Sequence, residues 1–139
     1  MRSRKPILLV EDDRVDALTV KRAFKEIEVN NRLDFAENGE DALEFLKDSA
    51  NENPCLILLD LNMPRMNGIE FLEVVKNDDN IKRIPVVVLT TSRDENDRMD
   101  SFNLGIAGYM IKPVDYRQFV DVVKTIDKYW NLSELPFEE

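Results

Sequence analysis

Residues 55–64 read CLILLDLNMP, an apolar run that leads directly into the carboxylate of Asp60. Five consecutive apolar residues after Pro54 predict a strand that is buried on both faces, as in a parallel sheet covered by helices. A carboxylate at the end of such a strand lies at the edge where open parallel sheets bind ligands. This stretch therefore predicts a fold class and a candidate site together.

Short apolar runs alternate with amphipathic segments along the whole chain, which predicts an α/β fold with a doubly wound, five-stranded parallel sheet and five helices. The run at 33–36 contains Asp34, as suits an edge strand. Of the helices, the fourth carries few apolar residues and is expected to be weakly anchored. The expected strands are residues 7–10, 33–36, 55–59, 86–90 and 109–111, and the expected helices are 14–28, 39–47, 69–76, 94–104 and one capped by Asp115.

The 139 residues fit a single domain, with a core at about residues 5–129 and a C-terminal tail at 130–139. No apolar run approaches the roughly 20 residues that a membrane-spanning helix needs, and the N-terminal apolar stretch is too short for a signal peptide. The single cysteine, Cys55, has no partner for an internal disulfide. We therefore expect a cytoplasmic protein without a membrane anchor.

Charge and composition exclude several classes of function. The chain has 19 basic and 28 acidic residues, a net charge of -9, and no run of lysine and arginine, which disfavours nucleic-acid binding. It also has no histidine, which excludes catalysis by Ser-His or Cys-His pairs and any histidine-ligated metal. Any phosphohistidine chemistry must use a histidine of another protein.

Polar residues follow four of the five expected strands. Glu11 and Asp12 follow the first strand, Asp60 ends the third, Thr90 ends the fourth and Lys112 follows the fifth. The carboxyl ends of parallel strands share one edge, so one crevice can hold all of these side chains. Neighbouring carboxylates repel one another unless a cation is present, and oxygen ligands with few protein groups suit Mg²⁺.

In this order and context the strand-end motifs resemble those of the receiver domain of two-component response regulators. The resemblance covers residues 5–129 and implies the flavodoxin-like receiver fold with strand order 2-1-3-4-5. The motifs that carry it are Glu11-Asp12-Asp13, Asp60 in LLDLNMP, Thr90 in VVVLTTS, Tyr109 and Lys112-Pro113.

The resemblance implies a metal site with Mg²⁺ as the cofactor. Its ligands would be Asp12, Asp60 and the backbone carbonyl of Asn62, with Glu11 in the outer shell through water. Asp13 falls one place beyond the acidic pair of the family. Without the other motifs, these acids would be interpreted as a turn that caps the first helix.

The resemblance makes Asp60 the phosphorylated residue and catalytic nucleophile, with Lys112 stabilising the incoming charge. It also implies a cis peptide bond between Lys112 and Pro113, which would aim the lysine into the crevice. Pro64 and Gly68 shape the loop after Asp60, and Gly68 is expected to supply backbone freedom before the third helix.

Thr90 is expected to complete the catalytic set by donating its hydroxyl to the phosphoryl group, and to move as a switch residue. The neighbouring Thr91 and Ser92 also carry hydroxyls, and Thr90 is chosen because it lies five residues after Pro85, where the switch hydroxyl of the family lies. Tyr109 matches the second switch residue of the family. Its alternative interpretation is a half-buried aromatic of the sheet.

The implied function is a stand-alone response regulator that accepts a phosphoryl group from the phosphohistidine of a sensor histidine kinase. The segments RIPVVVLTTS (83–92) and DKYWNLSELP (127–136) are similar to the subgroup associated with phytochromes. The fourth helix, fifth strand and fifth helix would form the output surface. Signalling would proceed by binding a partner, by passing the phosphoryl group on, or through a homodimer formed by the C-terminal face. The apolar residues of the tail either fold back onto the core of the chain or take part in such a contact.

Three alternative functions fit the sequence less well. A Mg²⁺-dependent aspartyl-phosphate phosphatase needs a second aspartate two residues after the nucleophile, where this chain has Asn62. A flavin mononucleotide protein of the same topology would place phosphate against the acids that follow the first strand, which would repel it. An adaptor that works without phosphorylation is disfavoured because every site residue is present. We therefore expect a phosphoacceptor signalling domain that catalyses only its own phosphorylation and dephosphorylation.

Overall fold

The computed structural model describes residues 5–132, and the side chains of residues 5–130. Five parallel strands form one sheet in the order β2-β1-β3-β4-β5, as expected. β1 and β3 therefore lie inside the sheet, and β2 is an edge strand. The strands are β1 (Ile7–Val10), β2 (Leu33–Ala36), β3 (Leu56–Leu59), β4 (Val86–Thr90) and β5 (Gly108–Ile111).

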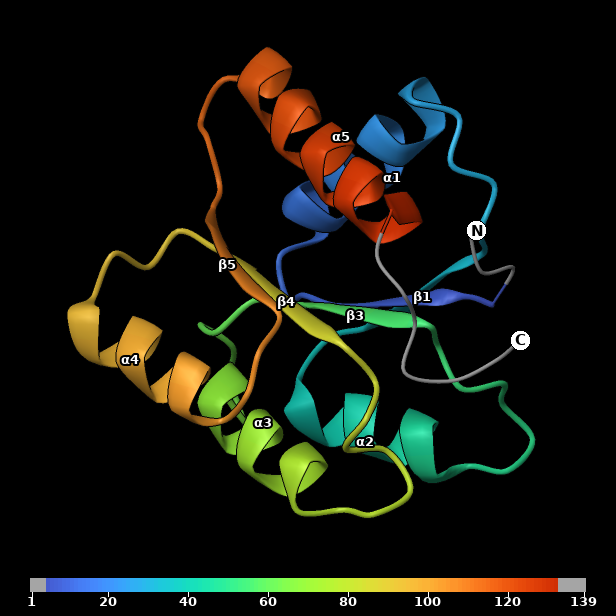
Figure 1. Ribbon diagram of the computed structural model, residues 1–139, viewed down its shortest axis with the longest axis vertical. Coiled ribbons are helices and arrows are strands. Elements are labelled where there is room, and N and C mark those ends of the chain that lie inside the picture. Colours follow the sequence, from blue (N-terminus) through green and yellow to red (C-terminus); the bar gives the residue numbers. More distant parts are fainter. Residues whose placement is uncertain (1–4, 133–139) are drawn as a thin grey trace.

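Five helices cover the two faces of the sheet. Figure 1 shows α1 and α5 on one face and α2, α3 and α4 on the other. Within the described residues, none of the helices combines the length and the apolar character needed to cross a membrane. The helices are α1 (Arg14–Glu26), α2 (Gly39–Lys47), α3 (Gly68–Lys76), α4 (Glu95–Asn103) and α5 (Tyr116–Leu132).

The sheet separates two hydrophobic cores, because successive side chains of a strand point to opposite faces. In β1, Leu8 and Val10 belong to the core under α2 and α3, whereas Ile7 and Leu9 belong to the core under α1 and α5. All four residues are buried, which explains the continuous apolar runs in the sequence. The two cores hold the central strands, and hence their carboxyl ends, in fixed positions.

Most element boundaries agree with the sequence, and the differences have local causes. α1 ends at Glu26 rather than at residue 28, because Glu28 has a positive φ of 62° that a right-handed helix excludes. β3 begins at Leu56, one residue later than expected. Asp115 caps α5 as predicted, since its carboxylate accepts a hydrogen bond of 2.8 Å from the backbone N–H of Arg117.

Candidate functional site

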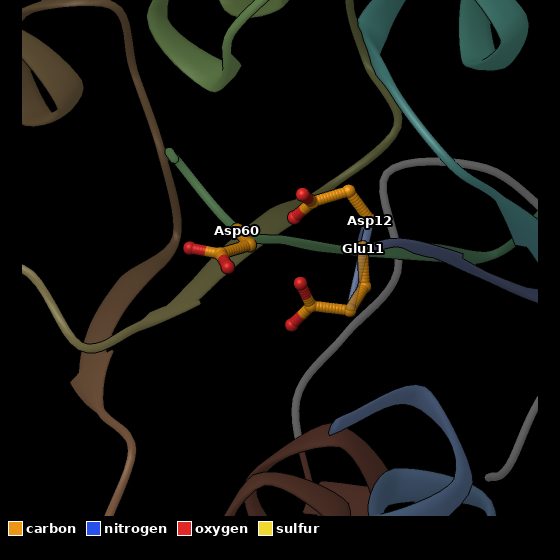
Figure 2. Close-up of side chains that lie close together, drawn as sticks. All are labelled: Glu11, Asp12 and Asp60. Atoms are coloured by element: carbon orange, nitrogen blue, oxygen red, sulfur yellow. The ribbon is translucent and has the colours of Figure 1, made fainter. Parts of the chain in front are cut away.

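Three carboxylates gather at the carboxyl ends of the two central strands. Glu11 and Asp12 follow β1, and Asp60 follows β3, which pairs with β1 in register. Their side chains lie close together (Figure 2), and one ligand oxygen from each lies within 4.8 Å of the others. Glu11 and Asp60 are buried, whereas Asp12 is exposed. The structure thus brings together the acids that the sequence predicted.

Lys112 enters this cluster from the end of β5 and is itself buried. Its Nζ donates hydrogen bonds to Glu11 Oε1, to Asp60 Oδ2 at 3.2 Å and to Asp16 Oδ2 at 3.0 Å. Two of these partners were predicted to share the site with the lysine, and Asp16 was not. One ammonium therefore holds carboxylates from three different segments of the chain.

The pKa values of Glu11 and Lys112 reflect this close packing. Burial is the main influence on the pKa of Glu11 and raises it. The hydrogen bond from Lys112 lowers this pKa and the charge of Asp60 raises it further, so that it reaches about 8. Burial would lower the pKa of Lys112, but its hydrogen bond to Glu11 and the charges of Asp60 and Glu11 outweigh that effect and raise it. We take Lys112 as a cation, because Asp16 and Asp60 also accept hydrogen bonds from it.

The donor set fits a hard divalent cation. A cavity of about 360 Å³ opens beside the cluster, with Asp12, Asn62 and Asp97 in its lining. The backbone N–H of Asn62 donates to Asp60 Oδ1 at 3.3 Å, which curls the loop toward the carboxylates. Burial and, after it, the charge of Asp60 raise the pKa of Glu11, and a divalent cation bound here would offset the repulsion between these carboxylates.

Close packing behind the site explains Gly68, and the sequence-based reason for this glycine was wrong. A Cβ at Gly68 would lie 2.7 Å from the Asp60 carbonyl oxygen and 2.7 Å from Leu61 Cα, so the residue is required by space and not by backbone freedom. Gly68 is also among the buried residues of α3. Within the loop between β3 and α3, Arg65 forms an ion pair of 2.6 Å with Glu40 of α2. The loop after Asp60 is therefore anchored at two points.

Thr90 and Tyr109 are linked through the segment that follows β4. Thr90 is fully buried, and its Oγ1 accepts a hydrogen bond of 3.2 Å from the backbone N–H of Ser92. The hydroxyl of Tyr109 donates to the carbonyl oxygen of Ser92 at 2.9 Å. The backbone N–H of Lys112 donates to the Thr90 carbonyl at 2.8 Å. The two expected switch residues therefore contact the same short segment.

The prediction of a cis peptide bond between Lys112 and Pro113 is wrong. No cis peptide bond occurs within the described residues. The trans form is the lower in energy for most X-Pro bonds. Here Lys112 reaches the cluster from the end of β5 without a cis bond, since its backbone is fixed to Thr90 across the ladder.

Two site residues were missed in the sequence. An acid in the first turn of a helix ordinarily interacts with the helix dipole, so the sequence gives no signal that Asp16 contacts Lys112. Asp97 of α4 accepts a hydrogen bond of 2.7 Å from Ser92 Oγ and lines the same cavity as Asp12. Its spacing in the sequence gave no signal, because only the position of α4 brings it to the crevice.

The comparisons with known proteins agree with this geometry. The family model of the response regulator receiver domain matches residues 7–124 of this sequence. The response regulator Rcp1 of Synechocystis is 38% identical over 130 residues, which covers 91% of this chain and 88% of Rcp1. The similarity thus extends over most of the length of both proteins.

Two crystal structures show the same fold. The phosphorylated cyanobacterial phytochrome response regulator RcpA superimposes with a TM-score of 0.90 at 36% identity, covering 97% of this chain and 100% of RcpA. The Mn²⁺-bound form of Rcp1 gives a TM-score of 0.89 at 35% identity, covering 97% of this chain and 100% of that structure. The chain belongs to the response regulator receiver domain family and is homologous to the phytochrome-associated response regulators.

Proposed function

We propose that Asp60 is the residue through which this receiver domain takes a phosphoryl group from the phosphohistidine of a sensor histidine kinase. The observation that carries the proposal is the buried carboxylate of Asp60, held at 3.2 Å by the ammonium of Lys112 beside two further acids. A carboxylate in this setting has a cation on one side and a binding site for a second cation on the other. Both lower the cost of bringing an anionic phosphoryl group to an anionic nucleophile.

In the reaction, an oxygen of Asp60 attacks the phosphorus atom and forms an O–P bond while the N–P bond to the histidine breaks. The electron pair of that bond leaves with the imidazole, which takes up a proton from water. Lys112 then neutralises part of the charge on the phosphoryl oxygens, and Thr90 donates its hydroxyl to one of them. Hydrolysis of the acyl phosphate returns Asp60 to a carboxylate, so the domain catalyses only its own modification.

We assign Mg²⁺ to the acidic cluster, with Asp12, Asp60 and the carbonyl of Asn62 as ligands and Glu11 in the outer shell through water. When bound, the metal supplies charge neutralisation and orients the phosphoryl oxygens. Mg²⁺ should raise the melting temperature of the wild type and have much less effect on Asp12→Asn. Equal shifts in the two proteins would contradict this ligand set.

The surface beside the site suits a docking kinase, and the homology supports a phytochrome-like one. A cleft of about 460 Å³ lies between α1 and the segment after β5, and it contains Lys112 in its lining. Val15 and Val114, which also line this cleft, are large exposed apolar residues. Exposed apolar groups in a cleft that reaches Lys112 are a basis for protein recognition beside the site. Such a kinase would act in the cytoplasm, where we place this protein.

For output we propose the surface of α4, β5 and α5, acting through a partner or a homodimer. Met99 and Phe102 of α4 and Tyr129 of α5 are large apolar or aromatic side chains that are each more than half exposed. The apolar residues of the tail, beyond Asn131, lie outside the residues whose side chains the structure describes. Truncation at Asn131 tests the tail: an unchanged monomer-dimer equilibrium in solution would remove it from the dimer contact.

The test of the central proposal is a comparison of wild type with Asp60→Asn. Each protein is incubated with Mg²⁺ and a small phosphodonor such as phosphoramidate, and intact mass is followed. Wild type is expected to gain the mass of one phosphoryl group and Asp60→Asn to gain none. Equal gain by both proteins would sink the assignment, and steady release of phosphate from many phosphoesters would indicate a phosphatase instead.

A further inference from the structure

Lys112 has one partner that the proposed reaction does not use. Asp16 lies in the first turn of α1, and its Oδ2 is 3.0 Å from Lys112 Nζ, slightly closer than the 3.2 Å to Asp60 Oδ2. The side chain of Asp16 is 39% exposed, whereas those of Lys112 and Asp60 are 6% and 9% exposed. Asp16 therefore covers the ammonium from the solvent side.

With Asp16 included, every hydrogen of the Lys112 ammonium has an acceptor. A lysine ammonium has three hydrogens to donate. Glu11, Asp16 and Asp60 are three acceptors, and they lie on three separate segments of the chain. Because the lysine stem is long and flexible, the number of acceptors decides how firmly Nζ is held. Loss of Asp16 would free one hydrogen to turn toward water and let the ammonium move from the nucleophile.

We propose that Asp16 is a positioning residue for phosphoryl transfer, which acts by holding Lys112 so that one of its hydrogens stays aimed at the reacting oxygens of Asp60. The proposal rests on the function proposed above, since it gives Asp16 a part in the phosphorylation of Asp60. When the phosphoryl group arrives, the N–H of Lys112 that donates to Asp60 donates to a phosphoryl oxygen instead. Glu11 and Asp16 keep the other two, so the lysine need not be repositioned.

The charge of Asp16 acts in the opposite direction, because it repels an incoming phosphoryl group. This repulsion passes between a partly exposed carboxylate and a group that enters from solvent, so water and salt screen it. The hydrogen bond that Lys112 donates to Asp16 is direct and involves a buried ammonium. Positioning therefore outweighs repulsion, and removal of Asp16 slows the transfer.

The experiment compares wild type, Asp16→Ala and Asp16→Asn with the control Asp13→Asn. Asp13 is the N-cap of α1 and is not among the three acceptors of Lys112. Asparagine removes the same charge and can still cap the helix. The measurement is the maximal rate of phosphorylation by phosphoramidate at saturating Mg²⁺. This rate is expected to fall about tenfold in Asp16→Ala and about threefold in Asp16→Asn, because asparagine keeps a neutral acceptor. The rate of Asp13→Asn should stay within about twofold of wild type.

Two further readouts separate positioning from a structural role. In a Lys112→Met background, adding Asp16→Ala should change the rate by less than about twofold, because its effect passes through Lys112. The Mg²⁺ concentration for half-maximal rate should be unchanged in Asp16→Ala, and thermal unfolding reports whether each variant is folded. Equal rates in wild type and Asp16→Ala, or a full tenfold further loss in the double variant, would overturn the proposal. Failure of wild type itself to gain a phosphoryl group would instead refute the proposed function.

Discussion

α3 and α4 are both nine-residue helices on the same face of the sheet, yet they are held very differently. α3 buries Phe71, Leu72 and Val75, and its N-terminus is fixed by a capping box between Asn67 and Glu70. In α4 the only buried residue is Ser101, and Met99 and Phe102 are half exposed. The expectation that the fourth helix is weakly anchored is confirmed.

We infer that this difference separates the proposed phosphoacceptor from the proposed output surface. α3 packs closely against the loop that begins at Asp60, where Gly68 leaves no space for a Cβ. α4 is fixed mainly by polar contacts near its start, where Ser92 Oγ donates to Asp97 at 2.7 Å. An element with few buried apolar contacts needs little free energy to move. We therefore expect phosphorylation of Asp60 to shift α4 more readily than α3.

The largest expected effect comes from truncating one phenylalanine on each helix. Phe71→Ala should lower the free energy of unfolding by about 3–5 kcal/mol, because it empties a fully buried position. Phe102→Ala, at a side chain 51% exposed, should change it by no more than about 0.5 kcal/mol. Urea denaturation measures both, and similar losses would break the distinction between the helices.

A smaller effect is expected from adding one methyl group at a glycine. Gly68→Ala should destabilise the fold by about 1–3 kcal/mol, because the new Cβ meets backbone atoms of the loop after β3. Gly108→Ala is the control on β5, where a Cβ has no atom within 4 Å, and it should change stability by less than about 0.5 kcal/mol. A neutral Gly68→Ala would mean that α3 does not press against the site.

The smallest expected effect concerns the contact between Tyr109 and the segment before α4. Tyr109→Phe removes one hydrogen bond, to the Ser92 carbonyl, and should cost about 1 kcal/mol. Hydrogen exchange should speed up at residues 91–94 and stay unchanged in α3. Tyr129→Phe, at an exposed ring on α5, serves as the control. Slower exchange at 91–94 would show that the contact does not hold this segment.

Most of the fold could be predicted because the three inner strands, β1, β3 and β4, are buried on both faces and therefore appear as continuous apolar runs. The candidate site followed from the same pattern, since Asp60 and Lys112 come directly after strands. The roles assigned to the individual site residues remain predictions.

Contacts between distant segments could not be predicted in this way. Asp16 and Lys112 are 96 positions apart, and nothing in the local sequence of either indicates the other. The crowding at Gly68 also depends on how closely α3 approaches the loop after β3, which composition does not encode. Such distances are set by the packing of side chains in the core, so they appear only in the folded chain.

The most direct test of this account is hydrogen exchange with and without phosphoramidate and Mg²⁺, in wild type and in Asp60→Asn. We expect phosphorylation to change the exchange of α4 and β5 in wild type, to leave α3 unchanged, and to have no effect in Asp60→Asn. An equal change in α3 and α4, or the same change in Asp60→Asn, would contradict the separation of a rigid phosphoacceptor from a mobile output surface.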